Sequence, residues 1–450
     1  MQLSLALSLC LCISATAASI VQVFPGQIPS RSNLPNDQAR SVFPKSRRAQ
    51  PNSEAQFGSI QDPQQECQPY GLDELTQMQH EQLFPKDWQV AGIMDNDSDA
   101  KQVWQDIQNS GVIPSNVQVK TANNETGDFM GVATSGYNTS SDPDCWWTAT
   151  TCSTPKQKAL ATDLTTCPEP DTWGLTFDDG PNCTHNGFYD FLQQNNLKAT
   201  MFYIGSNVLN NPLQAQRGIV DGHDICVHTW SHHYTTTLSN EQVFAELYYT
   251  AKVIKKVLGI TPTCWRPPFG DVDDRVRAIA FGLGLRTIVW QEDTDDWEIE
   301  PSGHASTQKI DSNYQSIFSK SSTESPIVLT HELVSQTMDE FQKMFPDLKK
   351  AYKNVVPLTA CQNISKPYPD SPISYPIYND FVSGKVNATN LPDGNTLRPN
   401  VTASYTPVPL NKTTTGYGLP QPGPNTGGSG ALGPSRNANG SPPPSSGSSP

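Results

Sequence analysis

Short apolar runs alternate with amphipathic segments across residues 145–361. The runs have the length of buried strands, and the segments between them have the periodicity of helices. A strand followed by a helix, repeated about seven times, predicts an α/β fold, a distorted (β/α) barrel with a parallel core, in which the chemistry lies at the carboxyl ends of the strands. The expected strands are Trp173–Phe177, Ala199–Ile204, Asp224–His228, Cys264–Arg266, Arg286–Gln291, Ile327–Thr330 and Val355–Leu358.

The expected helices lie between and before these strands. The clearest begins at Ser239, where Ser239 and Gln242 form a capping-box pattern, and it ends at Leu258 before Gly259. The other expected helices cover Asp273–Leu283, Gln308–Phe318 and Met338–Tyr352, with two more helix-like stretches upstream at residues 73–84 and 100–111.

The first expected strand, Trp173–Phe177, ends in two adjacent carboxylates, Asp178 and Asp179, which precede a Gly180-Pro181 break. Adjacent aspartates at a strand end repel each other unless a cation lies beside them. A divalent metal suits this place, because one carboxylate can bind it while the other takes a proton from water. The alternative is an ordinary turn with solvated aspartates, since Asp-Gly is common in turns.

Two histidines, His228 and His232, follow the expected strand DICV. A spacing of four places both imidazoles on one face if the turn is helical, which suits a shared metal. Together with Asp179 they would supply two nitrogens and one carboxylate, and such a set leaves positions open for water and substrate. The alternative is a surface turn with ordinary histidines.

Three more expected strands end in residues that can bind or catalyse. RPPFG follows one of them, and its prolines hold Arg266 and the Phe269 amide in a fixed backbone. DTDDW, residues 293–297, follows the next, and a tryptophan beside acids favours a wall that faces a sugar or an acyl group. LTH, ending in His331, follows the third. The simpler alternatives are a plain turn, a solvated acidic loop and a structural histidine.

The five motifs TFDDGP, HTWSH, RPPF, DTDDW and LTH occur in this order, each at an expected strand end. In this order they resemble the polysaccharide deacetylase (NodB-homology) family, carbohydrate esterase family four, and within it the fungal chitin deacetylases. The resemblance covers residues 145–365. It implies a barrel of the NodB-homology type and a metal-dependent hydrolase that converts chitin or chitin oligomers into chitosan and acetate.

The same resemblance implies a role for each matching residue. Asp178 would be the general base, and Arg266 would orient it. Asp179, His228 and His232 would bind a divalent metal, zinc or cobalt.

The remaining roles concern the acyl group and the leaving amine. The main-chain N–H of Phe269 would help to stabilise the oxyanion, and His331 would be the general acid with Asp296 as its partner. Trp297 and Leu329 would enclose the acetyl methyl group. The family usually has Tyr where this chain has Phe269, and we expect this departure to alter substrate binding without abolishing turnover.

The sequence leaves two alternatives to chitin deacetylation. One is a deacetylase of acetylxylan, peptidoglycan or another polysaccharide, which would keep the mechanism and change the substrate. The other is a non-catalytic wall-binding mannoprotein, which the complete set of metal and proton-transfer residues disfavours. A serine hydrolase is disfavoured because the sequence has no G-x-S-x-G elbow.

The ends of the chain differ in composition from its centre. Residues 1–18 resemble a secretory signal peptide with an Ala-Thr-Ala cleavage pattern. We expect residues 19–144 to form a partly disordered N-terminal extension, residues 145–365 the deacetylase domain and residues 366–450 a disordered tail rich in Pro, Ser, Gly and Thr. Such tails often precede a glycolipid anchor signal, but the terminal apolar stretch of that signal does not occur here.

Cysteines and charge indicate where the protein works. Ten cysteines are present, and eight remain once the signal with Cys10 and Cys12 is removed. An even number in a secreted chain predicts disulfides, and Cys167 with Cys361 is a candidate pair because the two bracket the central region. Several Asn-x-Ser/Thr sites indicate a glycosylated, cell-wall-associated exoprotein. The net charge of -14 argues against nucleic acid as a partner, and no other apolar run approaches transmembrane length.

Overall fold

A computed structural model describes residues 50–123, 131–299, 303–408 and 417. Its centre is an eight-stranded sheet in the order β7-β6-β5-β4-β3-β9-β8, with β10 also paired to β3. Every pairing in this sheet is parallel. The strands are β3 (Thr172–Gly180), β4 (Thr200–Tyr203), β5 (Asp224–Val227), β6 (Cys264–Trp265), β7 (Arg286–Thr287), β8 (Glu292–Asp293), β9 (Ile327–Leu329) and β10 (Asn354–Val356).

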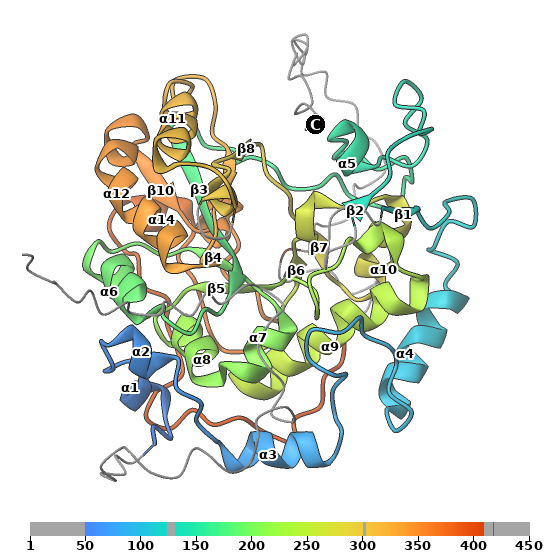
Figure 1. Ribbon diagram of the computed structural model, residues 1–450, viewed down its shortest axis with the longest axis horizontal. Helices are drawn as coiled ribbons and strands as arrows, with labels where there is room; N and C mark the ends of the chain where they lie inside the picture. The colour runs from blue at the N-terminus through green and yellow to red at the C-terminus, as the bar shows by residue number, and fades with distance from the viewer. Residues whose placement is uncertain (1–49, 124–130, 300–302, 409–416, 418–450) are drawn as a thin grey trace, which may run out of the picture.

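The sheet curls into a half-barrel with helices packed around its outside (Figure 1). The predicted α/β barrel class and all seven expected strands are therefore confirmed. Strand β8 was not expected, because its two residues are acidic and carry no apolar run. The helices are α5 (Trp147–Thr150), α6 (Asn186–Gln194), α7 (Gly205–Asn210), α8 (Pro212–Val220), α9 (Asn240–Leu258), α10 (Asp274–Gly282), α11 (Thr307–Phe318), α12 (Ser335–Ala351), α13 (Leu358–Cys361) and α14 (Tyr378–Val382).

Strand β3 pairs with three other strands of the sheet. Its nine residues are all buried, as expected for a parallel strand that is covered on both faces. Its first half pairs with β10 and β9, and its second half pairs with β4. The carboxyl ends of β3, β5, β6 and β9 consequently lie near one another, so their terminal side chains can form one site.

Helix α9 begins as the sequence predicts. The Ser239 side chain accepts a hydrogen bond from the Gln242 N–H (3.2 Å), and the Gln242 side chain accepts one from the Ser239 N–H (2.9 Å). The helix ends at Gly259, whose φ of 79° lies in the left-handed region that favours glycine. This capping fixes where the helix lies behind the strand ends that carry the candidate site.

The N-terminal extension is more ordered than expected over the residues that the structure describes. It contains α1 (Glu54–Phe57), α2 (Pro63–Glu66), α3 (Asp73–His80), α4 (Ser98–Asn109) and the hairpin of β1 (Ala122–Asn123) with β2 (Gly131–Val132). The Asn186 amide donates to the carbonyls of Phe57 and Ile60, and a disulfide joins Cys67 to Cys183. Figure 1 shows α1, α2, α3 and α4 along the outside of the barrel.

The expected disorder from residue 366 onwards is wrong for residues 366–408. The hydroxyl of Tyr368 accepts a hydrogen bond from the Ile225 N–H (2.7 Å), and the Tyr375 hydroxyl donates to the His223 carbonyl (2.9 Å). Both tyrosines are buried. Aromatic anchors spaced through a Pro-rich segment thus hold it against the barrel, although its composition predicts a coil. Residues 409–416 and 418–450 lie outside the described residues, as does the expected signal at 1–18.

Four disulfides occur within the described residues. They join Cys67 to Cys183, Cys145 to Cys152, Cys167 to Cys361 and Cys226 to Cys264. The candidate pair Cys167–Cys361 is confirmed; the other three pairings could not be read from sequence spacing. Among the described helices, none is both long enough and apolar enough to cross a membrane.

Candidate active site

Strand β3 delivers two carboxylates to its end in a strained turn. Asp179 has a φ of 72°, which an aspartate adopts only when its surroundings hold it there. The Asn207 amide donates to the Asp179 carbonyl (2.8 Å), and the Asp178 N–H donates to the Thr330 carbonyl (3.0 Å). These contacts fix the backbone of both aspartates, and an oxygen of each carboxylate lies within 4 Å of His228 Nε2.

Asp178 is paired with a buried arginine. Arg266 Nη1 donates to Asp178 Oδ1 (2.7 Å) and to the Thr176 hydroxyl (2.9 Å), and the guanidinium lies 4.2 Å from the ring centroid of Phe202. Arg266 is fully buried. Because the guanidinium binds Oδ1 of Asp178, the other carboxylate oxygen, Oδ2, can accept a second partner. The predicted partnership of Asp178 with Arg266 is therefore present in the structure as a contact.

Asp179 meets the two histidines of the HTWSH motif. Asp179 Oδ1 lies 3.4 Å from His228 Nε2 and 3.1 Å from His232 Nε2, and the three ligand atoms lie within 4.8 Å of one another. His228 Nδ1 lies 2.8 Å from the Arg266 carbonyl. Since a carbonyl only accepts, Nδ1 donates its N–H, and in the neutral ring Nε2 is then the nitrogen that a cation would bind. This is the tautomer that a metal-binding histidine needs.

The donor set fits a divalent cation. Among the described residues, Asp179 Oδ1 is buried and has no hydrogen-bond partner. Burial raises the pKa of Asp179, but the neighbouring His232 and His228 outweigh it and hold the pKa well below the ordinary value. A buried carboxylate oxygen beside two imidazole nitrogens is a suitable ligand set for a divalent cation. Two nitrogens and one carboxylate are the donors that catalytic zinc sites use.

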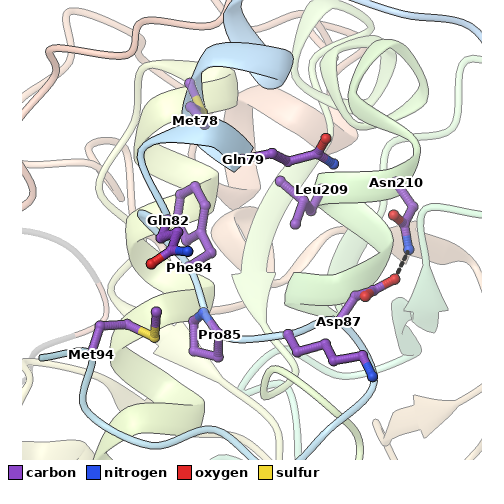
Figure 2. Close-up of a pocket in the computed structure, with 10 residues that line it drawn as sticks. Met78, Gln79, Gln82, Phe84, Pro85, Asp87, Met94, Leu209 and Asn210 are labelled. Atoms are coloured by element: carbon purple, nitrogen blue, oxygen red, sulfur yellow. Dashed lines mark hydrogen bonds between the residues drawn. The ribbon is translucent and has the colours of Figure 1, made fainter.

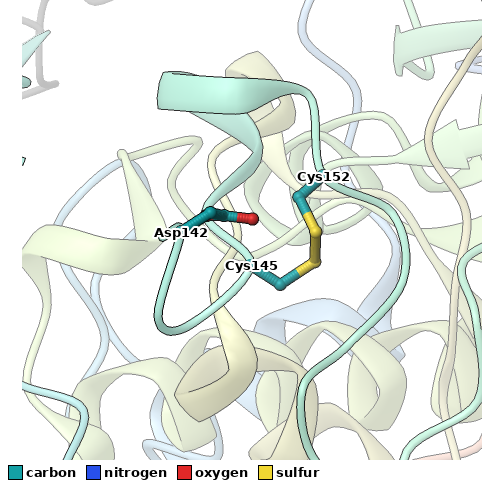
Figure 3. Close-up of side chains that lie close together, drawn as sticks. All are labelled: Asp142, Cys145 and Cys152. Carbon is teal, nitrogen blue, oxygen red and sulfur yellow. A yellow bond between two sulfur atoms is a disulfide. The ribbon is translucent and has the colours of Figure 1, made fainter. Parts of the chain in front are cut away.

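Two other groups of possible metal ligands occur in the described residues, and neither is a metal site. One consists of Asp142 with Cys145 and Cys152, and Figure 3 shows that the two cysteines are joined by a disulfide. The other contains Cys226 and Cys264, which also form a disulfide. A thiolate that is oxidised in this way cannot bind a cation. The Asp179 group is thus the metal candidate in the part of the chain that the structure describes.

His331 lies at the end of β9 and is bound by a buried aspartate. His331 Nδ1 lies 2.6 Å from Asp296 Oδ1, and the His331 N–H donates to Asp296 Oδ2 (2.9 Å). Burial lowers the pKa of His331, but Asp296 together with Asp179 and Asp178 raises it to about 10. The imidazole is therefore protonated at neutral pH and can give up a proton. Its Cα is the bridge partner of Asp178 across the sheet edge.

The remaining predicted residues lie around this centre with different exposures. The Phe269 side chain is 40% exposed and stacks on Tyr234 at 4.0 Å with an interplanar angle of 6°. Its edge lies against His232, with ring centroids 4.7 Å apart. Trp297 is 43% exposed, whereas Leu329 is buried. Phe269 and Trp297 are two of the few large apolar side chains that face solvent, as expected for a surface that a ligand covers.

Sequence reasoning missed Glu332, a fully buried residue next to His331. Its Oε1 lies 3.4 Å from the Tyr189 hydroxyl, and its backbone N–H donates to the Asp178 carbonyl (3.1 Å). Burial raises the pKa of Glu332 well above the ordinary value. A Cβ at Gly180 would lie 1.5 Å from Glu332 Oε1 and 2.9 Å from Tyr203 Cε1. Glu332 therefore fills the space beneath the Asp-Asp-Gly turn.

Replacement of Gly180 by Ala is expected to destabilise the protein by about 1–3 kcal/mol, because overpacked cores cost about that much. The buried Glu332 has no solvent to move into, and the turn that carries Asp179 would shift instead. Thermal unfolding and acetate release measure the two effects. Gly187→Ala is the control, since a Cβ there meets nothing within 4 Å. A Gly180→Ala protein as stable and active as the Gly187→Ala protein would contradict the prediction.

The chain is similar in sequence to a known family and to known proteins. The polysaccharide deacetylase family model matches residues 165–288. "Chitin deacetylase 2" of Cryptococcus neoformans var. grubii is 50% identical over 333 residues, which cover 72% of this chain and 71% of that protein. "Chitin deacetylase" of Amylomyces rouxii is 42% identical over 367 residues, which cover 80% of each.

A solved structure is also similar. The chitin deacetylase of Colletotrichum lindemuthianum has 27% sequence identity and a TM-score of 0.42, and the match covers 47% of this chain and 94% of that one. The conclusion on family rests on the sequence relatives, which this chain matches over more than two thirds of their length. The chain belongs to the polysaccharide deacetylase family of hydrolytic enzymes.

Proposed function

We propose that this protein is a secreted, metal-dependent chitin deacetylase of the fungal cell wall. It hydrolyses the N-acetyl groups of N-acetylglucosamine residues to give chitosan and acetate. The observation that supports this most is the cluster of Asp179 Oδ1 with the Nε2 atoms of His228 and His232, beside an Asp178 that Arg266 holds. The named substrate of the relatives from Cryptococcus and Amylomyces supports chitin over other acetylated polysaccharides.

In this proposal Asp179, His228 and His232 hold a zinc or cobalt ion. When bound, the ion acts as a Lewis acid towards the acetyl carbonyl and makes water more acidic. Asp178 Oδ2 accepts the proton of the attacking water, while Arg266 donates a hydrogen bond to the other oxygen and holds the carboxylate in place.

The other half of the reaction needs a donor for the oxyanion and an acid for the amine. The Phe269 N–H is the oxyanion donor, and its backbone is held in the left-handed region at a φ of 57°. His331 donates the proton of its Nε2 to the amide nitrogen as the C–N bond breaks. Asp296 accepts a hydrogen bond from His331 Nδ1, so the transferable proton is the one on Nε2 and the carboxylate stabilises the positive charge of the ring. Water thus supplies the oxygen of acetate, and the sugar keeps a free amine.

Trp297 and Leu329 are proposed to flank the acetyl methyl group, and the exposed Phe269 ring is proposed to contact the sugar. An apolar wall next to charged groups accepts a methyl group better than a longer polar substituent. We also propose residues 145–365 as the catalytic domain, with residues 19–144 as an extension and with a signal at residues 1–18 that directs secretion. The sequons are proposed glycosylation sites of the exported protein.

Removal of the metal is expected to stop acetate release from chitin oligomers, and added zinc or cobalt is expected to restore it. Acetate is measured enzymatically after treatment with a chelator and again after reloading. Matched reactions with acetylated xylan test the substrate. Cleavage of xylan but not of chitin would keep the mechanism and replace the substrate. Activity that survives complete removal of the metal would contradict the proposed metal dependence.

A further inference from the structure

The loop between the two metal-binding histidines is strained and fully buried at its centre. We call residues 229–231 the metal-ligand loop. Thr229 has a φ of 62° and His232 a φ of 57°, both in a region that non-glycine residues avoid. Trp230 has no exposed surface. Such a conformation persists only where surrounding contacts hold it.

A single buried carboxylate accepts three of the hydrogen bonds that hold this loop. Glu246, on α9, has no exposed surface. Its Oε2 accepts hydrogen bonds from the N–H groups of Trp230 (2.8 Å) and Ser231 (2.8 Å), and its Oε1 accepts one from the Ser231 hydroxyl (2.6 Å). Its fourth bond comes from another part of the chain, since the Ala91 N–H also donates to Oε1 (2.8 Å). Glu246 therefore joins the metal-ligand loop to the N-terminal extension.

The same segment of the extension touches the loop at a second place. The Phe84 ring stacks on Trp230, with centroids 5.7 Å apart and an interplanar angle of 14°. The Trp230 indole donates to the Lys86 carbonyl (3.0 Å). The Trp88 N–H donates to the Ser206 hydroxyl (2.8 Å), which itself donates to the Trp230 carbonyl (2.6 Å). We call residues 84–91 the clasp.

A hollow borders the outer side of the clasp. It has a volume of about 440 Å³ and is lined by Phe84 and Pro85 of the clasp and by Leu209 of α7; Figure 2 shows these side chains. At its edge the Asn210 amide donates to Asp87 Oδ2 (3.3 Å). The contacts with Trp230 and Glu246 join the clasp to the metal-ligand loop, and the hollow lies beside them. The clasp also lies outside residues 165–288, which the family model matches.

We infer that the clasp, acting through Glu246 and Trp230, positions the metal-ligand loop and sets the affinity of the site for its cation. This rests on the proposed metal site. Neither Phe84 nor Glu246 touches the reacting atoms, so both are positioning residues. Groups that orient metal ligands from behind typically change metal affinity by about 10–100-fold when removed. The N-terminal extension thereby contributes to metal binding at the catalytic centre.

The test compares Phe84→Ala in the clasp and Glu246→Gln in α9, together called the clasp variants, with Ile107→Ala. Ile107 is buried in α4 of the same extension, where it packs against Gly282 and not against the loop. Zinc dissociation constants are measured by competition with a chromophoric chelator. We expect both clasp variants to bind zinc about 10–100-fold more weakly, and the Ile107 variant to stay within about twofold of wild type. If Phe84→Ala does not fold, Phe84→Leu replaces it.

A second readout needs no metal. Hydrogen exchange of the Trp230 and Ser231 amides, followed in chelator-treated protein, should be at least about tenfold faster in the clasp variants, because local opening exposes them. Unchanged zinc affinity and unchanged exchange in folded clasp variants would overturn the inference. A wild-type protein that does not bind zinc would instead count against the proposed function, and the exchange rates would still decide the role of the clasp.

Discussion

Replacement of Asp178 by Asn is expected to lower the rate of acetate release by about 10²–10⁴-fold, the usual contribution of a general base. The amide has the shape of the carboxylate but cannot take a proton from water. Arg266 Nη1 can still donate to the side-chain oxygen at position 178, which keeps the site in place. The three metal ligands are unchanged, so zinc binding should persist. Acetate release and zinc stoichiometry, measured on the same preparation, separate loss of the base from loss of the metal.

Stability needs its own control, because Asn at 178 leaves the buried Arg266 without a counter-charge. Breaking a buried pair costs about 3–5 kcal/mol. Asp163→Asn removes the carboxylate from another buried pair, in which Arg277 Nη2 donates to Asp163 Oδ2 (2.7 Å). That variant should lose comparable stability and keep its kcat. A kcat for Asp178→Asn close to that of Asp163→Asn would remove Asp178 from the role of base.

The strands of the barrel could be predicted because they are short apolar runs, and buried parallel strands need such runs. The helices α6, α7 and α8 were not predicted. Segment α7 carries polar residues although four of its six residues are buried, so its periodicity is weak. The order of residues 366–408 was also missed, because the composition is that of a coil and single tyrosines do the anchoring.

The site was easier to predict than the groups that support it. The carboxyl ends of neighbouring parallel strands lie at the same edge of a sheet. Because each motif follows an expected strand, the sequence predicted that Asp178, Asp179, His228 and His331 would lie near one another, as they do. Glu246 was missed for a physical reason. A glutamate within a helix is normally a solvated residue, and only the fold shows that this one is buried against a loop.

Exchange of His331 for Gln is expected to lower kcat by about 10²–10⁴-fold, since the amine then leaves without a proton donor. Gln keeps a side-chain amide near Asp296 but has no proton to give at neutral pH. Zinc affinity should change little, because His331 is not one of the three proposed ligands. A variant that retains more than about a tenth of wild-type kcat would contradict the role of His331 as general acid.

Asp296→Asn tests whether the Asp296 carboxylate raises the pKa of His331, the proposed general acid. The general acid works while protonated, so activity should fall as pH rises through the pKa of His331. That pKa is raised to about 10 in the metal-free protein, and a bound cation would repel the imidazolium and lower it. Removing the Asp296 carboxylate should lower the pKa further and move the alkaline limb of kcat/KM to lower pH. Asp295→Asn is the control, because Asp295 accepts its hydrogen bond from Asn313 instead (2.9 Å).

The raised pKa of His331 also makes the stability of the folded protein depend on pH. Because the folded pKa of His331 lies above its ordinary value of 6.5, the His331–Asp296 pair contributes stability that is fully present below pH 6.5 and is lost as pH rises through about 10. Thermal unfolding of the metal-free protein between these two values should therefore show a falling Tm in wild type and a flatter one in Asp296→Asn. Equal slopes in the two proteins, with an unmoved alkaline limb, would mean that Asp296 holds the ring in place without setting its charge.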